Sequence, residues 1–311
     1  MKYYDLHCDS LTVCADKGRS LLGGGSQADF SKLKKSGCAL QCFAVFTEGA
    51  EAARDFERYL AYYNGQVRAA DGVLPVFSYA DIERAEREDK LACALTVENL
   101  GFIGENLDVL DGLKAAGVKM ASLVWNNANA LAAPNLVFEN GLPRFEKRSA
   151  VGLTSLGKEA VERLNALKII IDISHLSDGG ADYILNNARA PVVASHSNAW
   201  EVCPVSRNLT DGQIKKIADC GGVIGVNYCK DFLGGEPLEA VYRHIEHIIR
   251  VGGEEVAALG SDFDGIPAYE ELEDCTRLPA LFEFLVNRGI SPRLMQKLCY
   301  ENARRIFKYF G

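Results

Sequence analysis

The sequence predicts an α/β protein whose strands close into a (β/α)8 TIM barrel, and three observations on its 311 residues favour this fold. Short apolar runs recur along the chain, amphipathic segments of helical period separate them, and a polar residue closes nearly every run. Alternating strands and helices imply a parallel sheet covered on both faces, and eight such units suggest closure into a barrel. A chain of this length can form one barrel, so we expect residues 1–311 to form a single domain.

Eight runs have the composition of buried strands. They are Tyr3–Leu6, Cys38–Val45, Leu91–Val97, Met120–Val124, Ile169–Ile173, Val192–Ala194, Val223–Val226 and Val256–Leu259. Helical periodicity marks four of the segments between them, Arg54–Val67, Ser155–Leu167, Asp211–Ala218 and Leu238–Val251. Two longer segments with scattered Gly, Pro and Asn, Gly18–Ser31 and Asn127–Ala150, are expected to be loop insertions.

Composition excludes several classes of protein. The net charge of −8 argues against a nucleic-acid partner, because phosphate binding needs clustered Lys and Arg. The first residues resemble no export signal, and no apolar window approaches the roughly 18 residues of a membrane span. We therefore expect a cytoplasmic protein with no membrane partner. Its ten cysteines form no CxxC pair and are expected to be reduced, buried thiols.

Polar residues gather at the ends of the predicted strands, and in a (β/α)8 barrel the carboxyl ends of the strands carry the catalytic groups. The residues in question are His7, Asp9, Glu98, Asn126, His175, His196, Asn227 and Asp262. A random arrangement would not favour those positions. The sequence therefore predicts one functional site at that end of the barrel.

Three of these residues suit a metal ion. On a strand, His7 and Asp9 would face the interior together while Cys8 faced the helices, and an imidazole beside a carboxylate suits a divalent metal such as zinc. Taken alone, the pair is equally compatible with a chance pair in a loop. Glu98 closes the run Cys93–Val97, where a buried carboxylate is costly unless it is paired with a basic side chain or bound to metal.

Histidines supply the next candidates. His175 and His196 follow successive predicted strands and are two of only five histidines in the chain. A single histidine at such a position is more often a hydrogen-bonded core residue, but two on neighbouring strands favour metal ligands. His244 and His247 lie in the helical segment Tyr242–Arg250, away from the strand ends, and are expected to be structural.

Two further groups complete the predicted site. The segment Gly260–Gly265 follows the eighth strand, and its Asp262 is preferred over Asp264 as the proton-transfer group because it lies nearer to the strand end. Arg207 follows His196 in a loop, where a guanidinium would hold a substrate carboxylate through two hydrogen bonds. The alternative for Arg207 is an ordinary surface salt bridge.

These residues, in this order, resemble the membrane (renal) dipeptidase family of zinc peptidases, within the amidohydrolase superfamily of metal-dependent hydrolases. Several multi-residue motifs in register carry the resemblance along almost the whole chain. They are Asp5–Asp9, Gln27–Phe30, Gly152–Gly157, Asp172–His175, Ser195–Ser197, Arg207-Asn208, Gly260–Gly265 and Glu301–Arg305.

The resemblance implies a cofactor of two Zn²⁺ ions, although another divalent metal would suit the same ligands. His7 and Asp9 would bind one ion, His175 and His196 the other, and Glu98 would bridge them. The implied reaction is hydrolysis of dipeptides, including those with a D-residue at the C-terminal position, by a hydroxide that bridges the metals.

The resemblance also implies roles for the remaining residues. Asp262 would pass a proton to the leaving amine, Arg207 would hold the C-terminal carboxylate of the substrate, and Tyr228 would line the pocket. One catalytic position departs from the family pattern, because Asn126 aligns with a histidine that supports the developing oxyanion in the best-known members. Loss of an oxyanion donor costs about 10²–10³ in rate, so the departure puts turnover and substrate preference in question.

Two other functions stay open at this point. A related amidohydrolase would act on a lactone, a cyclic amide or an N-acyl amino acid, and Arg207 does not separate these substrates from dipeptides. A barrel that had lost its activity would serve as a binding protein, which the complete set of five metal-ligand candidates disfavours. The oligomeric state is also open, with a homodimer as the candidate assembly.

Overall fold

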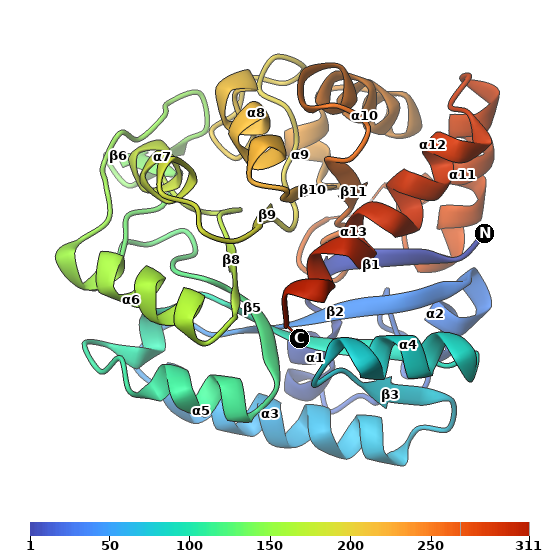
Figure 1. The fold of residues 1–311 in the computed structure, drawn as a ribbon, viewed down its shortest axis with the longest axis horizontal. Coiled ribbons are helices and arrows are strands. Elements are labelled where there is room, and N and C mark those ends of the chain that lie inside the picture. The colour runs from blue at the N-terminus through green and yellow to red at the C-terminus, as the bar shows by residue number, and fades with distance from the viewer. Residues whose placement is uncertain (268, 311) are drawn as a thin grey trace.

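Eight parallel strands form a closed barrel with helices packed around it (Figure 1) in the computed structural model, which describes residues 1–267 and 269–310. Around the ring the order is β1, β2, β4, β5, β8, β9, β10 and β11, and pairing of β11 with β1 closes it. Their bounds are β1 Tyr3–Cys8, β2 Cys38–Phe46, β4 Leu91–Glu98, β5 Val118–Ser122, β8 Ile170–Asp172, β9 Val192–Ala194, β10 Val223–Val226 and β11 Ala257–Leu259. Each of the eight predicted runs contributes one of these strands.

Three short strands were not predicted. β3 (Val73–Pro75) pairs with the amino-terminal half of β4, whose carboxyl-terminal half pairs with β5. β6 (Val137–Glu139) and β7 (Leu142–Arg144) form an antiparallel hairpin inside the segment expected to be a loop. The Asn140-Gly141 turn between them has positive φ at both residues, which is the usual geometry of a two-residue hairpin turn.

Helices connect the strands on the outside of the barrel, and α3, α6, α8 and α10 cover the four predicted helical segments. Side-chain caps fix two of their starts, since Thr154 accepts a hydrogen bond from the amide of Gly157, and Thr210 forms a capping box with Gln213. The bounds are α1 Ser10–Asp16, α2 Phe30–Ser36, α3 Ala52–Ala69, α4 Tyr79–Arg87, α5 Val109–Ala115, α6 Ser155–Ala166, α7 Asp178–Asn186, α8 Asp211–Asp219, α9 Lys230–Leu233, α10 Pro237–Gly252, α11 Leu278–Asn287, α12 Pro292–Gln296 and α13 Asn302–Ile306.

The barrel interior is filled by apolar side chains, and the carboxyl-terminal segment of the chain packs against them. One buried cluster joins side chains of all eight barrel strands to residues near the end of the chain. Its members include Tyr4, Leu40, Ala92, Met120, Ile170, Val193, Val223 and Ala258 from the strands and Ala303, Ile306 and Phe307 from the carboxyl-terminal segment. Because most of these strand residues lie near the strand starts, this segment covers the amino-terminal end of the barrel and leaves the opposite end for a site (Figure 1).

Two other expectations concern the chain as a whole. Nine of the ten cysteines are buried, as expected for small apolar side chains. Among residues 1–267 and 269–310, no helix combines the length and the apolar character that crossing a bilayer requires. A cytoplasmic location stays a prediction.

A partly buried ionic contact ties the carboxyl-terminal segment to α4. The carboxylate of Glu86 accepts hydrogen bonds from the hydroxyls of Tyr4 and Tyr300 and from two nitrogens of Arg304. Burial by itself would favour the protonated acid, but these hydrogen bonds lower the pKa of Glu86 to about 2. A carboxyl group whose pKa is lowered on folding stabilises the fold above its unfolded value of 4.5, and this stabilisation is lost as the pH falls from there towards 2.

We therefore expect Glu86→Gln to lower the unfolding temperature at pH 7, and the difference from the wild type to shrink as the pH falls below 4.5. Thermal unfolding across this pH range measures both effects. Glu88→Gln is the matched control, because Glu88 lies on the surface and its ion pair among the described residues is with Lys90. Equal unfolding temperatures of Glu86→Gln and the wild type at pH 7 would contradict this account of the contact.

Candidate active site

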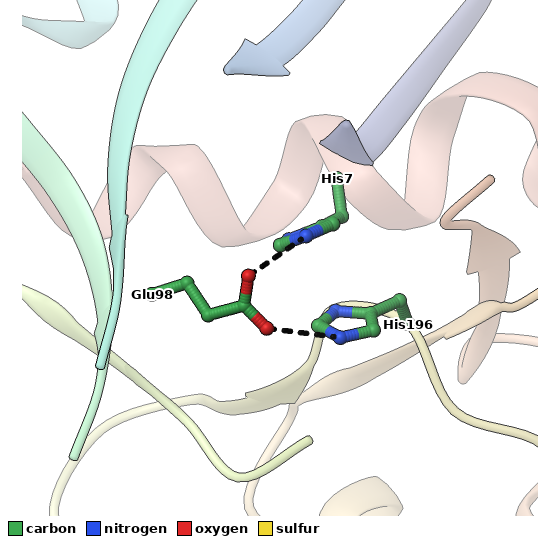
Figure 2. A group of neighbouring side chains, drawn as sticks. All are labelled: His7, Glu98 and His196. Carbon is green, nitrogen blue, oxygen red and sulfur yellow. Dashed lines mark ion pairs between the residues drawn. The ribbon is translucent and has the colours of Figure 1, made fainter. Parts of the chain in front are cut away.

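Four side chains from separate strands meet at the carboxyl end of the barrel. His7 is the penultimate residue of β1, Glu98 ends β4, and His175 and His196 follow β8 and β9 within three residues. All four are at most 5% exposed. Figure 2 shows His7, Glu98 and His196 pointing towards one another from their different strands.

The carboxylate of Glu98 lies between two sets of imidazoles. Its Oε2 is 3.6 Å from Nε2 of His7, whereas its Oε1 is 2.8 Å from Nε2 of His175 and 3.7 Å from Nε2 of His196 (Figure 2). Each oxygen of one carboxylate therefore faces different imidazole nitrogens. This is the arrangement that a carboxylate needs to contact two cations at once.

The surroundings of His7 fit a metal ion. Its Nε2 is buried and makes no hydrogen bond to any described residue. Oxygens of Asp9, Glu98 and Asp262 lie 3.4, 3.6 and 3.7 Å from this nitrogen, which is longer than a hydrogen bond. Two ligands that are each about 2.0–2.2 Å from a tetrahedral zinc ion are roughly 3.3–3.6 Å apart. The donor set and its spacing therefore suit zinc.

The charges of the chain's own side chains also favour a bound cation. Burial raises the pKa of Asp9 and of Glu98, and burial together with the neighbouring carboxylates raises the pKa of Asp262 to about 8. Although burial favours a neutral imidazole, the same three carboxylates raise the pKa of His7 to about 10. Three buried carboxylates around one imidazole are costly unless cations compensate them, and divalent metal ions would do so.

Hydrogen bonds determine which nitrogen His196 presents to the site. The single hydroxyl hydrogen of Ser195 is donated to Asp172, so Nδ1 of His196, 2.7 Å from the same hydroxyl oxygen, must be the donor to Ser195. Nε2 then carries the lone pair and faces Glu98. Burial also lowers the pKa of His196 well below its usual value, so the ring is neutral. A neutral ring with its lone pair on Nε2 is the form that binds zinc.

Asn126 orients His175 in the same way. Its amide oxygen lies 3.1 Å from Nδ1 of His175, and because this oxygen can only accept, Nδ1 carries the hydrogen and the lone pair lies on Nε2, which faces Glu98 and Nε2 of His196. Burial lowers the pKa of His175 as well. Asn126 also lines the cavity of the site. The structure thus gives Asn126 a positioning role that the sequence did not suggest, and its predicted oxyanion role stays a prediction.

The hydrogen-bond relay from Asp172 through Ser195 to His196 predicts the effect of a substitution at Ser195. We expect Ser195→Ala to weaken zinc binding about 10–100-fold without unfolding the protein, since this is the usual effect of losing a partner that orients a ligand. A zinc titration with a competing chelator measures the change. Ser197→Ala is the control, because Ser197 is equally buried and its hydroxyl makes no hydrogen bond to the described residues. Unchanged zinc affinity in Ser195→Ala would contradict the relay.

The prediction that His7 and Asp9 lie on one strand and face the same side was wrong. β1 ends at Cys8, and Asp9 is the N-cap of α1 with φ −97° and ψ 7°, so alternation along a strand does not apply to it. The turn into α1 brings its carboxylate beside His7 instead. Gly265 leaves room for this carboxylate, because a Cβ there would lie 2.1 Å from the Oδ2 of Asp9.

Asp262 reaches the site through an uncommon backbone conformation. Its φ of 64° lies in the left-handed region, which aspartate adopts more readily than most residues. The amide of Asn227 donates to its Oδ2 at 2.8 Å, and its Oδ1 faces His7. Asn227 closes β10 in the predicted pattern but had no predicted role. The structure shows that it holds the carboxylate of Asp262 in place.

Arg207 lies inside the site and not on the surface. Its side chain is 4% exposed and donates to the main-chain carbonyls of Ser174 and His196, which excludes the surface salt bridge. Its guanidinium is 3.2 Å from Nε2 of His175 and lies over the ring of Phe232. Arg207 lines a cavity of about 480 Å³ that also contains Glu98, Asn126, His175 and Asp262. This cavity has the size of a small-molecule site.

The structure does not bring Tyr228 to this cavity. Its side chain is completely buried, packs against the ring of Phe263 and is absent from the cavity lining. Tyr228 follows β10 in sequence, but its ring points into the apolar core, so the prediction that it lines the pocket is wrong.

The two remaining histidines make structural contacts, as expected. His244 receives a hydrogen bond from the amide of Ala199 and contacts the carbonyl of Leu233, both within the protein core. His247 pairs with Asp211 at 2.7 Å. Both contacts join α10 to neighbouring segments.

A (β/α)8 barrel with imidazoles and carboxylates gathered at the carboxyl ends of its strands defines the class of metal-dependent hydrolases. The model of one family within this class, the membrane dipeptidases of peptidase family M19, matches residues 1–310. The chain therefore belongs to the membrane dipeptidase family, and it is a metal-dependent hydrolase of peptide bonds.

Individual proteins are similar to this chain over most of its length. An uncharacterized dipeptidase of Schizosaccharomyces pombe is 30% identical over 313 residues, which cover 91% of this chain and 72% of the relative. An uncharacterized protein encoded in the pqqA 5′ region of Klebsiella pneumoniae is 39% identical over 239 residues, or 74% of this chain and 86% of the relative. A crystal structure of a metallopeptidase from Rhodobacter sphaeroides, liganded with a phosphinate mimic of L-Ala-D-Ala, superposes with a TM-score of 0.92. It is 27% identical and covers 100% of this chain and 99% of that one.

Proposed function

We propose that residues 1–311 form one catalytic domain, a dinuclear zinc dipeptidase. His7 and Asp9 would hold one ion, His175 and His196 would hold the other, and Glu98 would bridge them. The observation that carries this proposal is the placement of the two Glu98 oxygens, one 3.6 Å from Nε2 of His7 and the other 2.8 Å from Nε2 of His175. A single carboxylate in this position serves two cations.

When bound, the two ions supply Lewis acidity and a hydroxide nucleophile at neutral pH. The chain's own residues do the remaining work. Asp262, held by Asn227 at the wall of the cavity, accepts the proton of the attacking water and donates it to the leaving amine. Arg207 binds the C-terminal carboxylate of the substrate through its guanidinium, which favours short peptides.

A D-residue at the C-terminal position belongs to the proposed substrate range. Support comes from the Rhodobacter sphaeroides metallopeptidase, whose structure holds a mimic of L-Ala-D-Ala and which shares 27% of its sequence with this chain. We propose that both L,L- and L,D-dipeptides are substrates.

Metal analysis and a substrate screen on one preparation test the proposal. We expect two equivalents of zinc per chain and hydrolysis of L,L- and L,D-dipeptides, with far slower turnover of lactones, cyclic amides and N-acyl amino acids. Faster turnover of one of those three classes would identify a different amidohydrolase. Two equivalents of zinc without turnover of any compound would identify a binding protein instead.

A further inference from the structure

The cavity has two chemically different ends. At one end, Arg207 follows β9 and its guanidinium lies over Phe232, which in turn packs near Phe145. At the other end, the lining contains the carboxylates of Glu48, just after β2, and of Asp55, in the first turn of α3. β2 and β9 are four places apart in the ring of eight strands, so these ends lie on opposite sides of the barrel.

The end opposite Arg207 carries net negative charge. A third carboxylate, that of Asp16 at the end of α1, also lines it. Asp16 and Asp55 share one guanidinium, that of Arg58, at 2.7 and 3.0 Å, while Glu48 accepts a neutral hydrogen bond from the amide of Asn127. These contacts therefore set three carboxylates against one cation.

A separate observation at this end points to a ligand. Thr47, like its sequence neighbours Phe46 and Glu48, lines the cavity, and it is 2% exposed. Its hydroxyl makes no hydrogen bond to any described residue. A buried hydroxyl without a partner is unfavourable, so a bound polar group that reaches it would be stabilised there.

We propose that this acidic end, formed by Asp16, Thr47, Glu48 and Asp55, is the subsite for the N-terminal residue of the substrate and selects a cationic side chain. The inference rests on the proposed dipeptidase function. With the C-terminal carboxylate at Arg207 and the scissile bond over the zinc ligands, the N-terminal residue extends towards the opposite wall. Lysyl and arginyl dipeptides place their positive charge at this wall, and the phenyl rings beside Arg207 suit an apolar C-terminal side chain.

The test compares Lys-Ala with norleucine-Ala, whose N-terminal side chain has nearly the same shape but no charge. We expect kcat/KM of the wild type to be about 10–100-fold higher for Lys-Ala, which is the usual effect of a hydrogen bond to a charged group. The ratio should fall at high salt, because the acidic side chains are partly exposed. In the double variant Glu48→Gln/Asp55→Asn, the ratio should approach one.

Glu51→Gln is the matched control, since Glu51 lies between Glu48 and Asp55 in sequence, is exposed and does not line the cavity. It should keep the wild-type ratio. Equal hydrolysis of Lys-Ala and norleucine-Ala by the wild type, or an unchanged ratio in the double variant, would overturn the inference and leave the dipeptidase function intact. Hydrolysis of neither dipeptide would instead overturn the dipeptidase function, and this inference with it.

Discussion

Replacing Glu98 by glutamine is expected to weaken both zinc sites together and to reduce kcat/KM to a barely measurable level, because the metal ions supply both the nucleophile and the Lewis acid. A neutral amide removes one of the three buried carboxylates and offers only one oxygen, whereas the two oxygens of Glu98 face His7 on one side and His175 and His196 on the other. Elemental analysis of the purified variant, together with steady-state kinetics on a dipeptide, measures both effects.

Two further variants distinguish the loss of a bridging ligand from the loss of one metal site or of one negative charge. His7→Ala should empty mainly one zinc position, because only the first ion contacts this residue in the proposed site. Glu105→Gln is the matched control for charge, since Glu105 is exposed in the loop that follows β4 and should keep full metal content and activity. Two full equivalents of zinc in Glu98→Gln would show that Glu98 does not bridge the ions.

Replacing Asp262 by asparagine is expected to have the second largest effect, a fall in kcat of about 10²–10⁴-fold with metal content retained. Asparagine preserves the shape of the side chain and can still accept the hydrogen bond from Asn227, but it cannot take up a proton. Zinc analysis and single-turnover kinetics on the same preparation separate loss of metal from loss of proton transfer.

The neighbouring Asp264 provides the comparison. It also lines the cavity, but its carboxylate already accepts hydrogen bonds from the hydroxyl of Ser10 and the main-chain N–H of Gln27. Asp264→Asn should therefore retain much more of the turnover than Asp262→Asn. Near-normal kcat in Asp262→Asn, with a large loss in Asp264→Asn, would move the proton-transfer role to Asp264.

The barrel was predictable because its strands are buried on both faces and therefore appear as short apolar runs. Convergence of the site followed from the same pattern, since parallel strands place their carboxyl ends at one end of a barrel. Glu98 and His196 come from strands three places apart in the ring, yet they meet as expected. The dipeptide Asn140-Gly141 is also a recognisable hairpin signal, but the segment that contains it was predicted to be a loop.

Other features depend on three-dimensional contacts that no sequence pattern contains. The position of Asp9 results from the turn into α1, and that of Asp262 from a left-handed backbone conformation. The relay from Asp172 through Ser195 to His196 joins two strands, so spacing along the chain cannot indicate it.

The failure of the prediction for Tyr228 has the same origin. Adjacency to a strand end did not determine that its ring would turn towards Phe263 and the core. For such residues, position in the sequence gives the neighbourhood of the side chain but not its direction.

Anomalous diffraction at the zinc edge, from crystals grown with zinc, shows whether two cations share the carboxylate of Glu98. We expect two anomalous peaks, one beside His7 and Asp9 and one beside His175 and His196, each in contact with a different oxygen of Glu98. A single peak, or two peaks of which neither contacts Glu98, would contradict it.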